Sequence, residues 1–141
     1  MAPSTDRPLL VVEDDADIRE ALQGYLELQG YRVRVAKDGR EALASMEAQP
    51  LPALILLDMA LPGVDGHRVL MARGRSEALA QVPVVILSAG MADMHPRDRA
   101  VYAASQGVAA LLSKPVEPKQ LLETVRRLLP GTLASQADTH P

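Results

Sequence analysis

The segment Ala53-Leu54-Ile55-Leu56-Leu57-Asp58 consists of five consecutive apolar residues followed by an aspartate. Such a run is typical of a strand that is covered on both faces. Similar runs occupy residues 9–12 and 82–87, and a weaker one occupies residues 108–112. Residues 32–36 alternate between Arg and apolar residues instead, so we expect this strand to lie at an edge of the sheet.

Segments with helical spacing separate these runs. The clearest has apolar residues at i, i+3, i+4, i+7 and i+8 and is closed by Gly30; its members are Ile18, Ala21, Leu22, Tyr25 and Leu26. A second helix is expected around residues 42–46, with Asp38 as its N-cap, and a third at residues 121–129.

Two shorter helices are expected at residues 66–73 and 96–105. Their predicted inward-facing residues are Val69 and Leu70 in the first, and Val101 and Ala104 in the second. The predicted order is therefore a strand followed by a helix, five times over. This alternation predicts a parallel sheet with helices on both faces, which is a doubly wound α/β domain.

Length and composition agree with one folded domain. The chain has 141 residues, of which 48% are hydrophobic and 23% are charged. We expect the domain at residues 8–129, between a flexible N-terminus at residues 1–7 and a flexible tail at residues 130–141. The sequence contains no internal repeat.

The composition also disfavours several functions. A net charge of -3 and only three aromatic residues, all Tyr, disfavour binding of nucleic acid by this chain. The lack of cysteine removes disulfides, thiolate nucleophiles and cysteine-ligated zinc. No apolar run approaches the roughly 18 residues of a membrane span, and residues 1–8 carry no signal-peptide core. We therefore expect a cytoplasmic protein.

Acidic residues follow two of the predicted strands. Glu13, Asp14 and Asp15 follow the first, and Asp58 follows the third. Ligands of open parallel sheets bind beyond the carboxyl ends of the strands, and the first and third strands are the natural central pair. We expect Asp58 to lie within several ångströms of Glu13 and Asp14, where mutual repulsion requires a positive charge among them.

Carboxylate oxygens in a partly open cluster suit Mg²⁺. Lys114, which follows the fifth strand, supplies a second positive charge. A carboxylate between a metal ion and an ammonium can attack a phosphoryl group, because the transferring oxygens are neutralised from two sides. Ser88 can donate a hydrogen bond to a phosphoryl oxygen, and Ala89 leaves room for a bulky donor. The set predicts an aspartyl phosphate at Asp58.

Each of these residues also has a purely structural interpretation. The acids at the start of a helix can be N-caps or first-turn carboxylates, as Asp17 is expected to be, and Asp58 can belong to the turn before Leu61-Pro62-Gly63. Ser88 and Lys114, taken singly, are an ordinary hydroxyl and a solvated amine.

The histidines lack metal-ligand spacing and are interpreted as surface residues: His67, His95 and His140. The sequence also contains no phosphate loop, dinucleotide fingerprint, nucleophile elbow or zinc-protease motif.

Four motifs in order carry a resemblance to a known family. They are Val11-Val12-Glu13-Asp14-Asp15 with Ile18-Arg19, Leu56-Leu57-Asp58-Met59-Ala60-Leu61-Pro62-Gly63-Val64-Asp65-Gly66, Pro83-Val84-Val85-Ile86-Leu87-Ser88-Ala89, and Leu112-Ser113-Lys114-Pro115. From about residue 8 to residue 129 the chain resembles the receiver domain of bacterial two-component response regulators, as in stand-alone chemotaxis regulators. The resemblance implies a flavodoxin-like five-stranded sheet of order 2-1-3-4-5, which agrees with an edge position for residues 32–36.

The resemblance also implies a role for each site residue. Asp58 would be the phosphoacceptor, while Ser88 and Lys114 would contact the phosphoryl group. A cis peptide bond would precede Pro115. The implied ligands of Mg²⁺ are Asp14, Asp58, the backbone carbonyl of Ala60 and, through water, Glu13.

The sequence departs from the family pattern at two places. Leu111 stands where receivers carry Tyr or Phe as a rotating switch, so coupling between the hydroxyl and an aromatic ring does not carry over. Ser88 and Lys114 are 26 positions apart, about four more than is typical, which predicts an insertion in residues 90–96.

The expected function is a phosphorylation-driven switch. A histidine kinase or histidine phosphotransfer protein would phosphorylate Asp58 and bias a partner-binding surface around residues 96–105 and 108–129. The domain would assist its own phosphorylation and dephosphorylation without being an enzyme in the usual sense. Few residues follow 129, so we expect a stand-alone receiver or one cut from a longer chain, either monomeric or dimeric on phosphorylation.

Two alternatives stay open. One is a constitutive protein-interaction module that keeps the fold without phosphorylation, which Leu111 and the insertion favour. The other is a metal-dependent phosphatase with Asp58 as nucleophile. It requires a second acid two residues further on to protonate the leaving group, and that position is Ala60.

Overall fold

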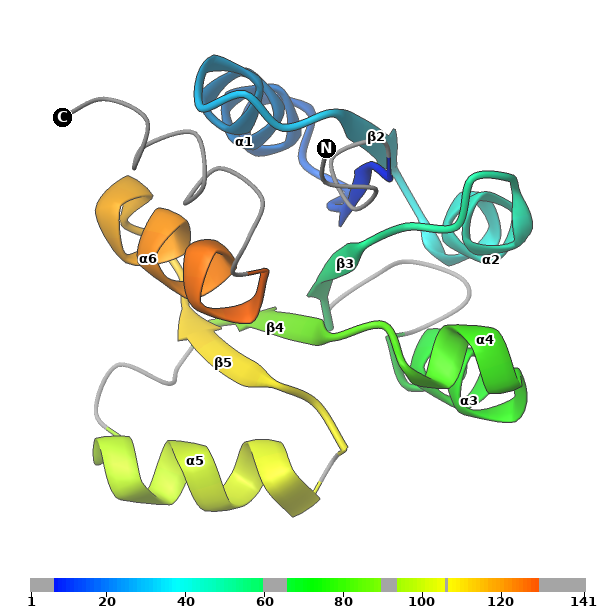
Figure 1. Cartoon of the computed structure of the whole chain (residues 1–141). Coiled ribbons are helices and arrows are strands. Elements are labelled where there is room, and N and C mark those ends of the chain that lie inside the picture. The colour runs from blue at the N-terminus through cyan, green and yellow to red at the C-terminus, as the bar shows by residue number, and fades with distance from the viewer. Residues whose placement is uncertain (1–6, 60–65, 90–93, 106, 130–141) are drawn as a thin grey trace, which may run out of the picture.

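The computed structural model describes residues 7–59, 66–89, 94–105 and 107–129. Five parallel strands form one sheet in the order β2-β1-β3-β4-β5 (Figure 1). Their bounds are β1 Leu9–Val12, β2 Val33–Ala36, β3 Leu54–Asp58, β4 Val84–Ser88 and β5 Ala110–Ser113. The predicted strand order is confirmed, and the alternating strand β2 lies at an edge.

Helices cover both faces of this sheet, as the doubly wound prediction requires. They are α1 (Ala16–Leu28), α2 (Gly39–Glu47), α3 (Gly66–Arg75), α4 (Glu77–Ala80), α5 (Pro96–Ser105) and α6 (Pro118–Leu128). In Figure 1, α1 and α6 lie on one side of the sheet, and α2 to α5 lie on the other. Within the described ranges, no helix combines the length and the apolar character needed to cross a membrane.

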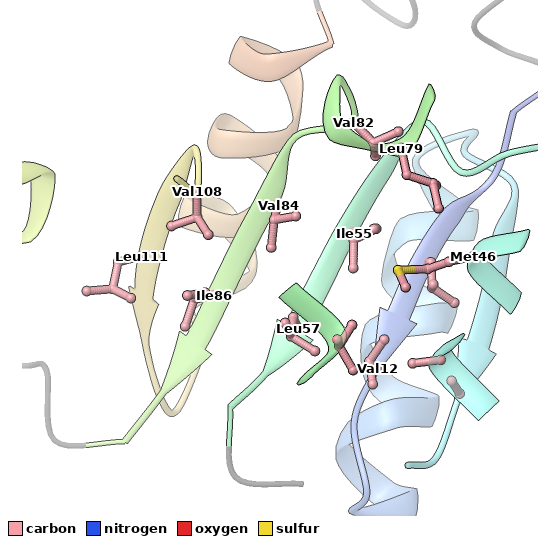
Figure 2. Packing of buried hydrophobic residues seen from close by; sticks show 14 of the residues in the cluster. Val12, Met46, Ile55, Leu57, Leu79, Val82, Val84, Ile86, Val108 and Leu111 are labelled. Carbon is pink, nitrogen blue, oxygen red and sulfur yellow. The ribbon is translucent and has the colours of Figure 1, made fainter. Parts of the chain in front are cut away.

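Alternate residues of each strand enter two separate apolar layers. On β1, Leu9 and Val11 pack in the layer of α1 and α6, whereas Leu10 and Val12 pack in the layer of α2 to α5. Figure 2 shows Val12 in this second layer together with Met46 of α2. All four β1 side chains are at most 1% exposed. Because both faces are covered, every strand position favours an apolar residue, which explains the unbroken runs in the sequence.

The short helix α4 has no counterpart in the sequence prediction. Ser76 caps it, because the Ser76 hydroxyl accepts a hydrogen bond from the Leu79 amide at 3.2 Å. Leu79 is buried against the sheet (Figure 2). A helix of four residues completes about one turn and therefore contains no apolar repeat that a sequence pattern could detect.

Helix α5 faces the sheet with a different residue from those predicted. Val101 is 64% exposed and Ala104 is exposed, whereas Ala103 is buried. The turn after the helix sets this rotation: the Val108 amide donates to the Ala103 carbonyl at 3.0 Å, and Gly107 has φ +71°, where glycine is favoured. The prediction of Val101 and Ala104 was wrong because this alanine-rich helix carries little amphipathic pattern.

Three arginines bind backbone carbonyl groups at the amino ends of the strands. Arg7, Arg34 and Arg73 have their shortest hydrogen bonds to the carbonyl oxygens of Pro52, Pro50 and Val82, at 2.7, 2.8 and 2.9 Å respectively. These charge-assisted bonds hold the loops that lead into β3 and β4. We expect residues 1–7 and 130–141 to be flexible; of these, Arg7 alone lies within the described ranges.

Candidate functional site at the carboxyl ends of the strands

The three acids that follow β1 have different environments. Glu13 is fully buried, whereas Asp14 and Asp15 are exposed. Asp15 is the N-cap of α1, since its side chain accepts a hydrogen bond from the Ile18 amide at 3.0 Å. Its own amide donates to Glu13 Oε2 at 3.2 Å. The structural interpretation therefore holds for Asp15 and leaves Glu13 and Asp14 for the site.

Asp58 ends β3 and is 2% exposed. Because β3 lies next to β1 in the sheet, its carboxyl end meets the acids that follow β1. Carboxylate oxygens of Glu13, Asp14 and Asp58 lie within 4.8 Å of one another, the proximity expected from the strand order. Three such oxygens, with one carboxylate exposed to solvent, suit a small divalent cation that keeps some of its water.

Lys114 supplies the positive charge among these carboxylates. Its Nζ atom lies 3.0 Å from Glu13 Oε1 and 3.1 Å from Asp58 Oδ2. Its backbone amide donates to the Ser88 carbonyl at 3.0 Å, which joins the end of β5 to the end of β4. The Lys114–Pro115 peptide bond is cis, as the resemblance implies.

Burial and charge perturb two groups of the cluster. Burial raises the pKa of Glu13; hydrogen bonds from Lys114 and the Asp15 amide oppose this effect, and the charge of Asp58 adds to it. Burial acts to lower the pKa of the Lys114 ammonium, but its contacts with Glu13 and Asp58 outweigh burial, so this pKa is raised. Lys114 therefore stays charged at neutral pH, and Glu13 is a weaker acid than usual.

The raised pKa of Glu13 predicts a pH dependence of stability. The folded protein holds this proton at pH values where the unfolded chain has lost it. Without Mg²⁺, the free energy of unfolding should therefore fall as pH rises from the ordinary glutamate pKa, about 4.3, through the raised value. Urea unfolding in EDTA at a series of pH values measures this, with Glu13→Gln as comparison. Equal slopes for the two proteins over this window would contradict the prediction.

Ser88 ends β4, opposite Ser113 in the register, and is half-buried. Its hydroxyl donates to the Ala89 carbonyl at 3.2 Å, so a rotation of the side chain would free this donor for a ligand.

Ala60, the predicted backbone ligand, lies outside the described ranges. Residues 90–93 of the predicted insertion also lie outside them.

Two residues next to the cluster have no role in the sequence interpretation, although both belong to its motifs. Arg19 donates hydrogen bonds to the backbone carbonyls of Glu13 and Asp14. Gly66 begins α3 against Met59, the residue after the acid of β3; a Cβ atom on Gly66 would lie 2.6 Å from Met59 Sδ and 3.0 Å from Met59 Cα. In the sequence, Arg19 could be noticed only as a cation about one helical turn after the acids, and Gly66 only as a glycine at the start of a helix.

Comparison with known proteins gives a consistent family. The sequence pattern of the response regulator receiver domain matches residues 9–126. The response regulator protein FleR of Pseudomonas aeruginosa is 39% identical over 134 residues, which is 94% of this chain but 27% of FleR. The chain spans between about a quarter and just over half of the length of the first curated relatives it matches.

Solved structures agree with this comparison. A response regulator receiver protein from Pseudomonas putida is 31% identical with a TM-score of 0.72, covering 86% of this chain and 97% of its own. The receiver domain of a sensor histidine kinase from Pseudomonas aeruginosa PAO1 is 28% identical with a TM-score of 0.73, covering 87% and 97%. That second structure has a magnesium ion coordinated in its active-site cleft.

Proposed function

The chain belongs to the response regulator receiver family, and we propose from this premise that it is a phosphoacceptor of a two-component system, modified on Asp58. The observation that carries the proposal is the environment of Asp58. This buried acid lies within 4.8 Å of the carboxylates of Glu13 and Asp14 and 3.1 Å from the ammonium of Lys114. The nucleophilic oxygen of Asp58 therefore lies beside both a candidate cation site and a fixed positive charge.

Mg²⁺ is the cofactor we propose for this site. Its chemistry fits the donors, because Mg²⁺ prefers carboxylate oxygens and retains several waters. Asp14 and Asp58 would bind the ion directly, Glu13 would bind it through water, and the Ala60 carbonyl would be a further ligand. When bound, the ion supplies positive charge that neutralises the oxygens of the transferring phosphoryl group. The magnesium ion in the related Pseudomonas receiver domain supports this choice.

In the proposed reaction, a carboxylate oxygen of Asp58 attacks the phosphorus atom of a phosphohistidine on the donor protein. The P–O bond to Asp58 forms and the P–N bond breaks. The imidazole, already protonated on its other ring nitrogen, takes the electron pair of the broken bond and leaves as the neutral base. Lys114 keeps its proton and faces the negative charge of the phosphoryl oxygens. The Ser88 hydroxyl rotates away from the Ala89 carbonyl and donates to one of these oxygens.

The donor would be a histidine kinase or a histidine phosphotransfer protein, acting in the cytoplasm. The domain assists its own phosphorylation and dephosphorylation instead of turning over a separate substrate. A downstream protein would then recognise the surface of α5, β5 and α6, with the domain monomeric or dimeric. Leu111 is 6% exposed and packs in the layer of α5, so we propose that this surface changes by shifts of packing and not by rotation of a ring.

The proposal is tested by incubating the purified chain with acetyl phosphate, with and without Mg²⁺, and recording the intact mass. We expect one phosphoryl adduct that requires Mg²⁺ and is absent from Asp58→Asn. Asp17→Asn, which neutralises an exposed acid of α1, is the matched control and should keep the adduct. No adduct on the folded protein at saturating Mg²⁺ would contradict the proposal and support the constitutive interaction module instead.

A further inference from the structure

The guanidinium of Arg19 reaches from the first turn of α1 back to the loop between β1 and α1. Its Nη1 atom lies 2.9 Å from the carbonyl oxygen of Glu13 and 3.4 Å from that of Asp14. These are the two residues of this loop whose carboxylates contribute to the cluster. One arginine nitrogen therefore contacts the carbonyl groups of two consecutive residues that contribute carboxylates to the candidate cation site.

These two peptide groups lie on either side of Asp14. The Glu13 carbonyl belongs to the plane before the Asp14 Cα atom, and the Asp14 carbonyl belongs to the plane after it. Because each peptide is planar, holding both planes restricts the two backbone dihedrals of Asp14 and with them the direction of its Cβ atom. The orientation of the Glu13 carboxylate depends less on Arg19, because this side chain is buried and forms an ion pair with Lys114.

We propose that Arg19 is a positioning residue for the cation site. By holding the peptide groups on both sides of Asp14, it keeps the exposed Asp14 carboxylate directed at Glu13 and Asp58. The inference rests on the proposed function in one respect, which is that Asp14 binds Mg²⁺. Arg19 would be a further residue of the Mg²⁺ site, one that affects the ion only through the backbone of the loop.

The guanidinium has two effects on cation binding, and they have opposite signs. Its positive charge repels a cation, so removal of the charge alone should tighten Mg²⁺ binding. Loss of positioning should weaken binding instead, because groups that orient metal ligands are typically worth about 10–100-fold in affinity. The sign of the change in affinity therefore separates a positioning role from simple screening of the acids.

The experiment is calorimetric titration of Mg²⁺ into the full chain. We expect Arg19→Met to weaken Mg²⁺ binding by about tenfold, although it removes a positive charge. Arg19→Lys keeps the charge, and its ammonium can reach a single carbonyl, so we expect an affinity between those of the parent and Arg19→Met. Arg126→Met, a change at an exposed arginine of α6, is the matched control and should change the affinity by less than about twofold.

Tighter or unchanged Mg²⁺ binding by folded Arg19→Met would overturn the inference. If Arg19→Met does not fold, Arg19→Lys decides: an affinity equal to that of the parent overturns the inference, and a weaker one supports it. Failure of the parent chain itself to bind Mg²⁺ would overturn the proposed function together with this inference. The parent titration therefore distinguishes the two failures.

Discussion

Lys114→Met is expected to slow phosphorylation of Asp58 by acetyl phosphate by on the order of 100-fold and, at the same time, to tighten Mg²⁺ binding by about tenfold. Both effects follow from the ammonium lying 3.0 Å from Glu13 and 3.1 Å from Asp58. Without it, the carboxylates attract a cation more strongly. The phosphoryl oxygens, however, lose the second of the two positive charges that would stabilise them during transfer.

The opposite signs make this prediction specific. A variant with a damaged fold would lose both metal binding and phosphorylation, whereas removal of the ammonium separates them. Calorimetry with Mg²⁺ and a time course of intact mass measure the two effects, and circular dichroism checks the fold. Lys119→Met makes the same change at an exposed lysine of α6 and should alter neither quantity. Phosphorylation of Lys114→Met at the parent rate would rule out the proposed role.

Asp14→Asn is expected to weaken Mg²⁺ binding by well over about tenfold, and to lower the yield of the phosphoryl adduct at limiting Mg²⁺ accordingly. Asp14 offers a carboxylate oxygen within 4.8 Å of those of Glu13 and Asp58. Its side chain is exposed, so the substitution leaves the core unchanged and we expect normal stability. The loss of affinity would come from the lost ligand charge.

The neighbouring residue provides a closely matched control. Asp15→Asn removes the same charge one position along the chain, but the Asp15 side chain caps α1 through the Ile18 amide. Asparagine caps a helix about as well as aspartate does, so stability should be kept. Only a weak, salt-dependent change in Mg²⁺ affinity is expected. Equal losses of affinity in Asp14→Asn and Asp15→Asn would show that general charge, and not ligation, explains the effect.

The sequence was sufficient to predict the strands and the meeting of the acids. Covered parallel strands require apolar residues at every position, and the run that ends in Asp58 meets this requirement without interruption. Parallel strands also end at one edge of the sheet, so residues after β1 and β3 had to meet there. Helix α4 was not predicted, since one helical turn contains no repeat, and the prediction that Val101 of α5 faces inward was wrong.

By itself, then, the sequence determined the fold class, the strand order through its family resemblance, and the acids that share one edge of the sheet. The fold class depends on apolar patterns within single segments, which burial requires, and the meeting of the acids follows because parallel strands end at one edge of the sheet. Only the tertiary structure decided that the Lys114 ammonium contacts both Glu13 and Asp58, and that Arg19 binds the backbone behind Asp14. The physical reason is that such contacts depend on how segments are placed in three dimensions and on where carbonyl oxygens point, which no periodicity of side chains records.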